Sequence, residues 1–265
     1  MMTAEKYGPI LTLIFLPFLL HGASSKNIGI ESRIVGGENV ALQGEYPYMV
    51  ALLFKNRTMC GGTILNENYI LTAAHCIHNL DLQYYEVLSG SNLLSEANIH
   101  VVTEAKEHEE FIFQQNLPND VGLMKVNPPF VFGEFVQPVT LIDQGLEIND
   151  TTASGVALGW GMIYSGSDYP NELMKVELDV FSDEECLNAY FYGPTERSIC
   201  AGMSIGSDSQ LGICGGDAGG PLIVDGIQVG IISWARVPCG EPGFPAVFAQ
   251  VSYYTDWIKA NSGLV

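Results

Sequence analysis

The sequence predicts an all-β protein built of closed barrels. Short alternating or apolar runs recur from Arg33 onward and are broken by Gly, Asn and Pro, which is typical of strands joined by turns. Helical periodicity is rare, and many short strands with few helices favour barrels over an open sheet. Two barrels of roughly 110 residues each would use up the chain that follows the N-terminal leader.

Five runs are the clearest strand candidates: residues 46–54, 85–90, 121–126, 155–161 and 173–181. Residues 221–234 read as a hairpin, because Asp225-Gly226 between two apolar runs suits a tight turn with positive φ. The run "VNPPFVFGEF", with Pro128 and Pro129, is a candidate link between the two β halves.

Two segments favour helices. Ser182 is a candidate N-cap with Glu185 three residues later, the pattern of a capping box. In the C-terminal segment, Tyr254, Trp257 and Ile258 are spaced i, i+3 and i+4, and Gly263 follows as a stop signal. We therefore expect a short helix after residue 182 and a packed C-terminal helix.

Residues 1–25 read as a secretory signal peptide. Lys6 precedes an apolar run from Ile10 to Leu20, which Pro17 interrupts, and the small residues of "HGASS" suit signal peptidase. The run is too short to span a bilayer, and no second apolar segment of membrane length follows. We expect a secreted, extracellular protein that is not anchored in a membrane.

The six cysteines fit an oxidising compartment, because their number is even and the chain carries a secretion signal. Spacing alone leaves about 15 possible pairings. A metal site is the alternative, but no C-x-x-C occurs, and His75, Cys76 and His78 in "HCIH" make only a weak ligand cluster. No acidic loop has the pattern of a calcium site. We expect no metal and no cofactor.

The formal net charge is −19, from 30 acidic against 11 basic residues. Such a field excludes nucleic acid and anionic membranes as natural partners. It leaves open a cationic partner or peptide, or simply a solvated acidic surface that keeps the protein soluble. Asn56 and Asn149 lie in N-glycosylation sequons, which fit secretion.

Four motifs carry residues that could take part in activation or catalysis. "SRIVGG" is a processing site, since cleavage after its arginine creates a new charged amine, and "LTAAHC" places a histidine at a strand end. "NDVGLMKV" leads an aspartate into an apolar strand, and "CGGDAGGPL" crowds an aspartate and an alanine among glycines. The residues concerned are Arg33, Ile34, His75, Asp120, Asp217 and Ala218.

Together, in this order and spacing, the motifs resemble the chymotrypsin-like serine peptidase family from Ile34 to about Ile258. "GWG" at 159–161, "SICAG" at 198–202 and "ISWA" at 232–235 add to the likeness. The resemblance implies two packed six-stranded antiparallel β-barrels and a C-terminal helix. We therefore expect a propeptide at 26–33, a first barrel at about 34–140, and a second barrel with the helix at about 141–265.

The resemblance also implies roles for residues. His75 would be the general base, oriented by buried Asp120, and the amides of Gly216 and Ala218 would form an oxyanion hole. After an activating protease cuts behind Arg33, the amine of Ile34 would pair with Asp217. The implied disulfides are Cys60–Cys76, Cys186–Cys200 and Cys214–Cys239. The last two would brace the specificity pocket.

Ala218 stands where the family carries its nucleophilic serine. In a comparable catalytic triad, loss of the serine lowers kcat by a factor of about 10⁶. Ser204, Ser207 and Ser209 lie upstream as substitute hydroxyls, but attack geometry tolerates only small misplacement. Because the sequence retains its leader, we expect the alanine to be natural rather than introduced.

The pocket positions also depart from trypsin-like members. Gly212 stands where those members have an aspartate that binds Lys or Arg, and Ala235 and Ala246 stand at wall positions that are usually glycine. Two methyl groups would narrow the pocket toward an elastase-like shape, so we expect no arginine-directed cleavage.

These observations lead us to expect a secreted, monomeric serine protease homologue that is not an enzyme and acts by binding. Its partner would be a protein or peptide: a shielded peptide, a sequestered inhibitor or a component of a proteolytic cascade. The retained Arg33, Ile34 and Asp217 would either switch binding on or persist as parts of the fold. The alternatives are an active endopeptidase with elastase- or chymotrypsin-like preference whose serine is replaced in this sequence, and a storage or structural protein without a site.

Overall fold

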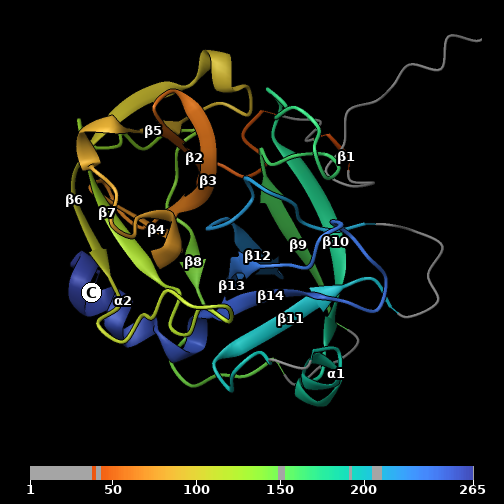
Figure 1. Ribbon diagram of the computed structural model, residues 1–265. Coiled ribbons are helices and arrows are strands. Elements are labelled where there is room, and N and C mark those ends of the chain that lie inside the picture. Colours follow the sequence, from red (N-terminus) through yellow and green to blue (C-terminus); the bar gives the residue numbers. More distant parts are fainter. Residues whose placement is uncertain (1–37, 40–42, 149–152, 191–192, 205–210, 265) are drawn as a thin grey trace, which may run out of the picture. The chain divides into compact units, whose positions relative to one another are not determined.

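Two six-stranded antiparallel barrels lie side by side, as the sequence predicted (Figure 1). The computed structural model describes residues 38–39, 43–148, 153–190, 193–204 and 211–264. The predicted signal peptide falls outside these residues, as do Arg33, Ile34 and Asn149. Asn56 is described, and it lies exposed in the turn between two strands.

The first barrel is closed by six strands in the order β2-β3-β4-β7-β6-β5. Their bounds are β2 Met49–Phe54, β3 Arg57–Ile64, β4 Tyr69–Thr72, β5 Tyr85–Ser89, β6 Asn98–Glu107 and β7 Gly122–Asn127. Alternating apolar side chains from every strand fill one core, in which Leu52, Ile70 and Leu123 are almost fully buried.

The second barrel follows the order β10-β11-β14-β13-β12-β9, and a β10–β9 pairing closes it. Its strands are β9 Ser154–Gly159, β10 Met174–Phe181, β11 Ser198–Gly202, β12 Pro221–Val224, β13 Ile227–Trp234 and β14 Ala246–Gln250. Two short strands add to it: β1 Glu38–Asn39 on β10, and β8 Thr140–Leu141, parallel to β13. The β12–β13 turn has positive φ at both Asp225 and Gly226, as the hairpin signal required.

Helices are few and short. α1 spans Asp183–Asn188, and Ser182 and Glu185 form its capping box. α2 spans Thr255–Ser262 and ends at Gly263, whose φ is 74°. Single 3₁₀ turns occur at η1 Ala74–Cys76, η2 Leu82–Tyr84, η3 Leu94–Glu96 and η4 Val251–Tyr253. None of the helices in the described ranges has the length and apolar character needed to cross a membrane.

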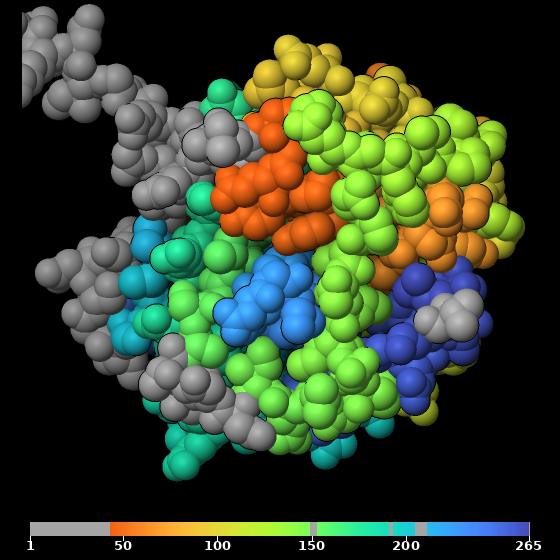
Figure 2. Space-filling model, turned by 180° about the vertical axis from the view of Figure 1, so that it is seen from behind, coloured from red at the N-terminus to blue at the C-terminus, as the bar shows by residue number. Residues whose placement is uncertain are grey.

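The C-terminal helix packs on the first barrel, although it follows the second in sequence (Figure 1). Ile258 is buried in the first barrel's core cluster, and the Nδ2 of Asn66 donates a 2.9 Å hydrogen bond to the Ser262 carbonyl. The connection that includes β8 crosses the rear face between the two halves, as the green segment of Figure 2 shows. Helix and connection therefore fasten each barrel to the other.

Buried polar contacts fix the barrels against each other. Thr63 of β3 donates a 2.7 Å hydrogen bond to Gln228 of β13, and both side chains are buried. The indole N–H of Trp160 donates to the carbonyl of Asn92 at 3.0 Å. Because an unpaired buried polar group is costly, these bonds specify one relative position of the barrels.

Candidate active site

His75 and Asp120 come together because β4 and β7 are antiparallel neighbours. Thr72 of β4 pairs with Gly122 of β7, so the residues that follow β4 and precede β7 meet at one edge of the first barrel. A side chain at Gly122 would come within 2.8 Å of Ile77, so the glycine permits the close approach. His75 Nδ1 lies 2.7 Å from Asp120 Oδ2, and the His75 backbone N–H donates to Oδ1 at 2.8 Å.

Asp120 has a third donor that the motifs did not identify as a site residue. Ser233, in β13 of the second barrel, donates its hydroxyl to Asp120 Oδ2 at 2.5 Å, and both side chains are buried. The "ISWA" motif contained this serine, but only the fold reveals its partner 113 residues away. With Nδ1–H directed at the carboxylate, Nε2 of His75 is the nitrogen that can take up a proton.

The "HCIH" motif does not form a metal site. Cys60, His75 and Cys76 place their ligand atoms within 4.8 Å of one another. Both sulfurs, however, are joined in the Cys60–Cys76 disulfide, so neither is the thiolate that a metal requires. His78 turns away and pairs with Glu107 at 2.7 Å.

All six cysteines are paired, in the three pairs that the resemblance implies: Cys60–Cys76, Cys186–Cys200 and Cys214–Cys239. The first lies beside His75, whose Nε2 is 3.7 Å from Cys76 Sγ. The third joins the loop that carries Ala218 to the segment after β13.

The glycine-rich loop before β12 is held against the first barrel. The Ala218 carbonyl accepts a 2.7 Å hydrogen bond from the backbone N–H of Gly61, next to Cys60. A Cβ on Gly219, whose φ is +80°, would come within 2.2 Å of Thr72, three residues before His75. The second barrel's loop therefore lies against the strand that leads to His75.

Two amides of this loop have the character of an oxyanion hole. Among the described residues, neither the N–H of Gly216 nor that of Ala218 donates to a protein acceptor. Gly216 has φ +98°, and a Cβ there would lie 2.6 Å from the Tyr169 ring, so glycine is required. Unpaired backbone donors fixed in a loop are suited to stabilise a developing negative charge.

Asp217 is fully buried between these amides. Its Oδ1 accepts from the N–H of Gly161 and its Oδ2 from that of Cys214, both at 2.8 Å. Burial raises the pKa of this carboxyl to about 7, against the two hydrogen bonds that lower it. Ile34, the expected partner, lies outside the described residues.

The "GWG" motif is explained by the same carboxyl. A Cβ on Gly159 would lie 2.1 Å from Asp217 Oδ1, and one on Gly161 would lie 2.4 Å from its Cγ. Both glycines therefore make room for the aspartate. Trp160 between them reaches the first barrel through its bond to Asn92.

The predicted pocket residues lie near one another. Ala235 follows β13 and Ala246 begins β14, and these strands pair at Trp234 and Val247. A Cβ on Gly212 would lie 2.9 Å from the Gly240 Cα, so an aspartate does not fit there without a backbone shift.

Of the three upstream serines considered as substitute nucleophiles, Ser204 is described and is bonded elsewhere. Ser204 donates to Asp179 at 2.8 Å, at the end of β11 in the second barrel. Ser207 and Ser209 lie outside the described residues. The site thus contains a base, its orienting carboxylate, a positioning hydroxyl and two free amides, with the Ala218 methyl group at the nucleophile position.

Comparison with known proteins identifies the family. The trypsin family model matches residues 34–258. Mouse (Mus musculus) kallikrein-1 is 34% identical over 263 residues, covering 93% of this chain and 96% of that protein, and trypsin-1 of Astacus astacus is 36% identical over 250 residues, covering 86% and 100%. The structure of neuropsin, a serine protease expressed in mouse brain, superposes with a TM-score of 0.75 at 30% identity and covers 84% of this chain and 98% of that one.

These relatives contradict our expectation that the chain is not an enzyme. Kallikrein-1, trypsin-1 and neuropsin are serine proteases, and nothing in the comparisons points to a loss of catalysis. The expectation depended on Ala218 and, less strongly, on the pocket positions Gly212, Ala235 and Ala246. His75 and Asp120 lie within hydrogen-bond distance of each other, and Ser233 adds a further donor to the carboxylate. The chain belongs to the trypsin family of serine proteases.

Proposed function

We propose that this protein is a secreted serine endopeptidase that prefers small or medium apolar side chains, and that its sequence here carries alanine at the nucleophile position. One observation carries the proposal. The His75–Asp120–Ser233 network is complete, with the carboxylate accepting three hydrogen bonds of 2.5 to 2.8 Å. With a hydroxyl at position 218, this network would orient His75 to accept the hydroxyl proton.

The chemistry follows from the geometry. A serine at 218 would place its hydroxyl on the Cβ that Ala218 now carries, on a loop fixed to Gly61. His75 Nε2 would take the hydroxyl proton while Asp120 stabilises the resulting imidazolium. The oxyanion of the tetrahedral intermediate would accept from the amides of Gly216 and residue 218, and each such donor is typically worth about 10²–10³ in kcat.

The proposed secretion and the proposed preference for apolar side chains rest on separate observations. Three disulfides use every cysteine, which fits an oxidising compartment. The methyl groups of Ala235 and Ala246 would narrow the proposed pocket, and Gly212 would provide no negative charge for Lys or Arg. Activation would require cleavage after Arg33, which frees the Ile34 amine to pair with Asp217.

The test compares the chain as given with its Ala218→Ser variant, both cleaved after Arg33. Fluorogenic peptides would present Ala, Val, Leu, Phe or Arg before the scissile bond. We expect the serine variant to hydrolyse the apolar substrates with kcat about 10⁶ above that of the alanine chain, and to leave the Arg substrate uncut. Ala218→Ser combined with His75→Ala is the matched control. A folded, cleaved serine variant that hydrolyses none of the peptides would refute the proposal.

A further inference from the structure

The loop that carries Asp120 is held from the second barrel at a second point, besides Ser233. This loop joins β6 to β7, and Asn119 precedes Asp120 in it with a φ of 60° less 3°, that is 57°, in the left-handed region. The Asn119 carbonyl accepts from the N–H of Val121 at 2.8 Å, so Asp120 is the central residue of a three-residue turn. The direction of the carboxylate therefore depends on the conformation of Asn119.

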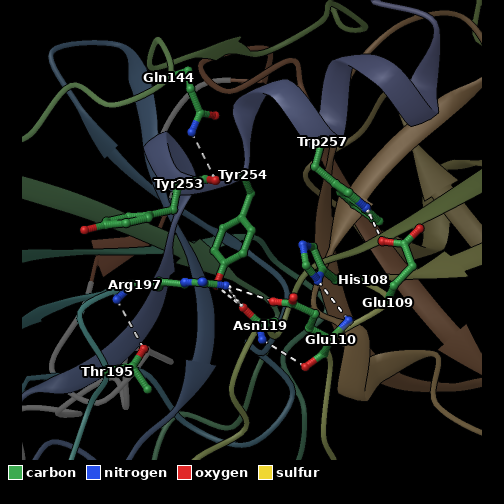
Figure 3. Close-up of polar contacts among 10 residues, drawn as sticks. All are labelled: His108, Glu109, Glu110, Asn119, Gln144, Thr195, Arg197, Tyr253, Tyr254 and Trp257. Atoms are coloured by element: carbon green, nitrogen blue, oxygen red, sulfur yellow. Dashed lines mark hydrogen bonds and ion pairs between the residues drawn. The ribbon is translucent and has the colours of Figure 1, made fainter.

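The Asn119 side chain is hydrogen-bonded through both its nitrogen and its oxygen. Its Nδ2 donates to the Glu110 carbonyl at 2.9 Å, across the same loop. Its Oδ1 accepts from Arg197 Nη1 at 2.8 Å and from the Tyr254 hydroxyl at 3.1 Å. Figure 3 shows the guanidinium and the hydroxyl directed at this side chain. These bonds hold a backbone conformation that few residues other than glycine and asparagine adopt.

Both donors to Asn119 come from residues whose backbones are fixed. The Arg197 carbonyl accepts from the N–H of Gln250 at 2.9 Å, where β11 begins beside β14. The Arg197 N–H donates to the Thr195 hydroxyl at 3.2 Å. Tyr254 is 2% exposed, and its N–H donates to the Val251 carbonyl at 2.8 Å. The second barrel and the C-terminal turn thus place the two donors.

The Arg197–Asn119 bond contributes more to this arrangement than the neighbouring ion pair. Arg197 also contacts Glu110 at 3.2 Å, but the Glu110 side chain is 67% exposed. An ion pair so open to solvent contributes little, because water and salt screen it. The bond to Asn119 is charge-assisted and partly buried, and it acts on the residue next to Asp120.

We propose that Arg197 is a positioning residue for the His75–Asp120 pair and acts through Asn119. The guanidinium keeps Asn119 in its left-handed conformation, and this conformation keeps the Asp120 carboxylate directed at His75 Nδ1. The contribution to hydrolysis rests on the proposed function. The effect on the hydrogen bond between His75 and Asp120 does not, because that bond exists in the chain with Ala218.

The first test uses the full chain with Ala218 and needs no turnover. The proton on His75 Nδ1 gives a separate downfield resonance in proton NMR when a carboxylate holds it. We expect Arg197→Gln to shift this resonance upfield and to broaden it, because the carboxylate is less well directed. Lys175→Gln is the matched control. It also removes one positive charge, from a 2.9 Å ion pair between β10 and Glu45, and should leave the resonance unchanged.

A double-mutant cycle separates the hydrogen bond from the charge. Asn119→Gly removes the side chain but leaves Arg197 in place, and glycine accepts a positive φ. It should reproduce the change seen in Arg197→Gln. The double variant should change the resonance no further than either single variant, because the two residues act as one unit.

The second test measures turnover in the Ala218→Ser form. Arg197→Gln should lower kcat about fivefold with KM unchanged, because small misplacement of a catalytic group slows the reaction without weakening substrate binding. Arg197→Lys should recover part of the loss, since lysine restores the charge but not the planar guanidinium. Lys175→Gln should keep the kcat of its parent.

The outcomes distinguish the two proposals. An unchanged resonance in Arg197→Gln, equal changes in Arg197→Gln and Lys175→Gln, or additive effects in the double variant would overturn the positioning role. Should Arg197→Gln not fold, an unchanged resonance in Asn119→Gly would overturn it equally. A shifted resonance together with a serine form that hydrolyses none of the peptides would refute the proposed function and leave the positioning role supported.

Discussion

Asp217 makes the stability of the uncleaved chain depend on pH in an unusual direction. Its folded pKa is about 7 against an ordinary 3.8, because it is fully buried and, among the described residues, is bound by two backbone N–H groups and no cation. The folded protein then holds a proton that the unfolded chain releases between these values. Stability therefore falls as pH rises from about 4 to about 7, by roughly 4 kcal/mol in total.

Urea unfolding followed by tryptophan fluorescence from pH 4 to 8 measures this effect when the chain is compared with Asp217→Asn. The variant loses one hydrogen-bond acceptor at every pH, so its curve of unfolding free energy against pH is shifted by a constant. Because it has no carboxyl at position 217, the pH dependence that Asp217 causes is absent from this curve. We expect the free energies of unfolding of the two proteins to diverge by roughly 4 kcal/mol across this range, with the parent losing stability. Asp143→Asn, at an exposed aspartate, is the control and should follow the parent.

Parallel curves for the parent and Asp217→Asn would refute the reasoning, because they would mean that Asp217 is ionised in the folded protein throughout. Cleavage after Arg33 offers a further comparison. If the Ile34 amine pairs with Asp217, the cleaved chain should show a much weaker dependence on pH than the uncleaved one.

Two other predictions concern single positions. Ser233→Ala in the Ala218→Ser form should lower kcat about tenfold, or about 1.4 kcal/mol, with KM unchanged, because Asp120 loses one of its three donors. Gly159→Ala should lower the free energy of unfolding by about 1–3 kcal/mol in urea, since its Cβ would meet Asp217 at 2.1 Å, whereas Gly133→Ala, with open space around it, should not.

Local signals in the sequence predicted the local structure well. The capping box of Ser182 and Glu185 and the Asp225-Gly226 turn both formed where their chemistry required, because each depends on neighbours a few residues apart. Strand periodicity and motif order likewise indicated the two barrels, which the neuropsin structure matches.

Features that depend on distant contacts could not be predicted in this way. Ser233 contacts Asp120 across 113 residues, and nothing in its neighbourhood shows which carboxylate it meets. The expectation that the chain is not an enzyme was wrong because it gave Ala218 more weight than the family that the other motifs indicate.

The division of the site between the barrels has a consequence for biosynthesis. His75 and Asp120 belong to the first barrel, while Ser233 and the glycine-rich loop belong to the second. A chain emerging from the ribosome N-terminus first can complete the first barrel long before residue 233 is made. The full arrangement of His75, Asp120, Ser233 and the glycine-rich loop therefore cannot form until the final segment of the chain has been made.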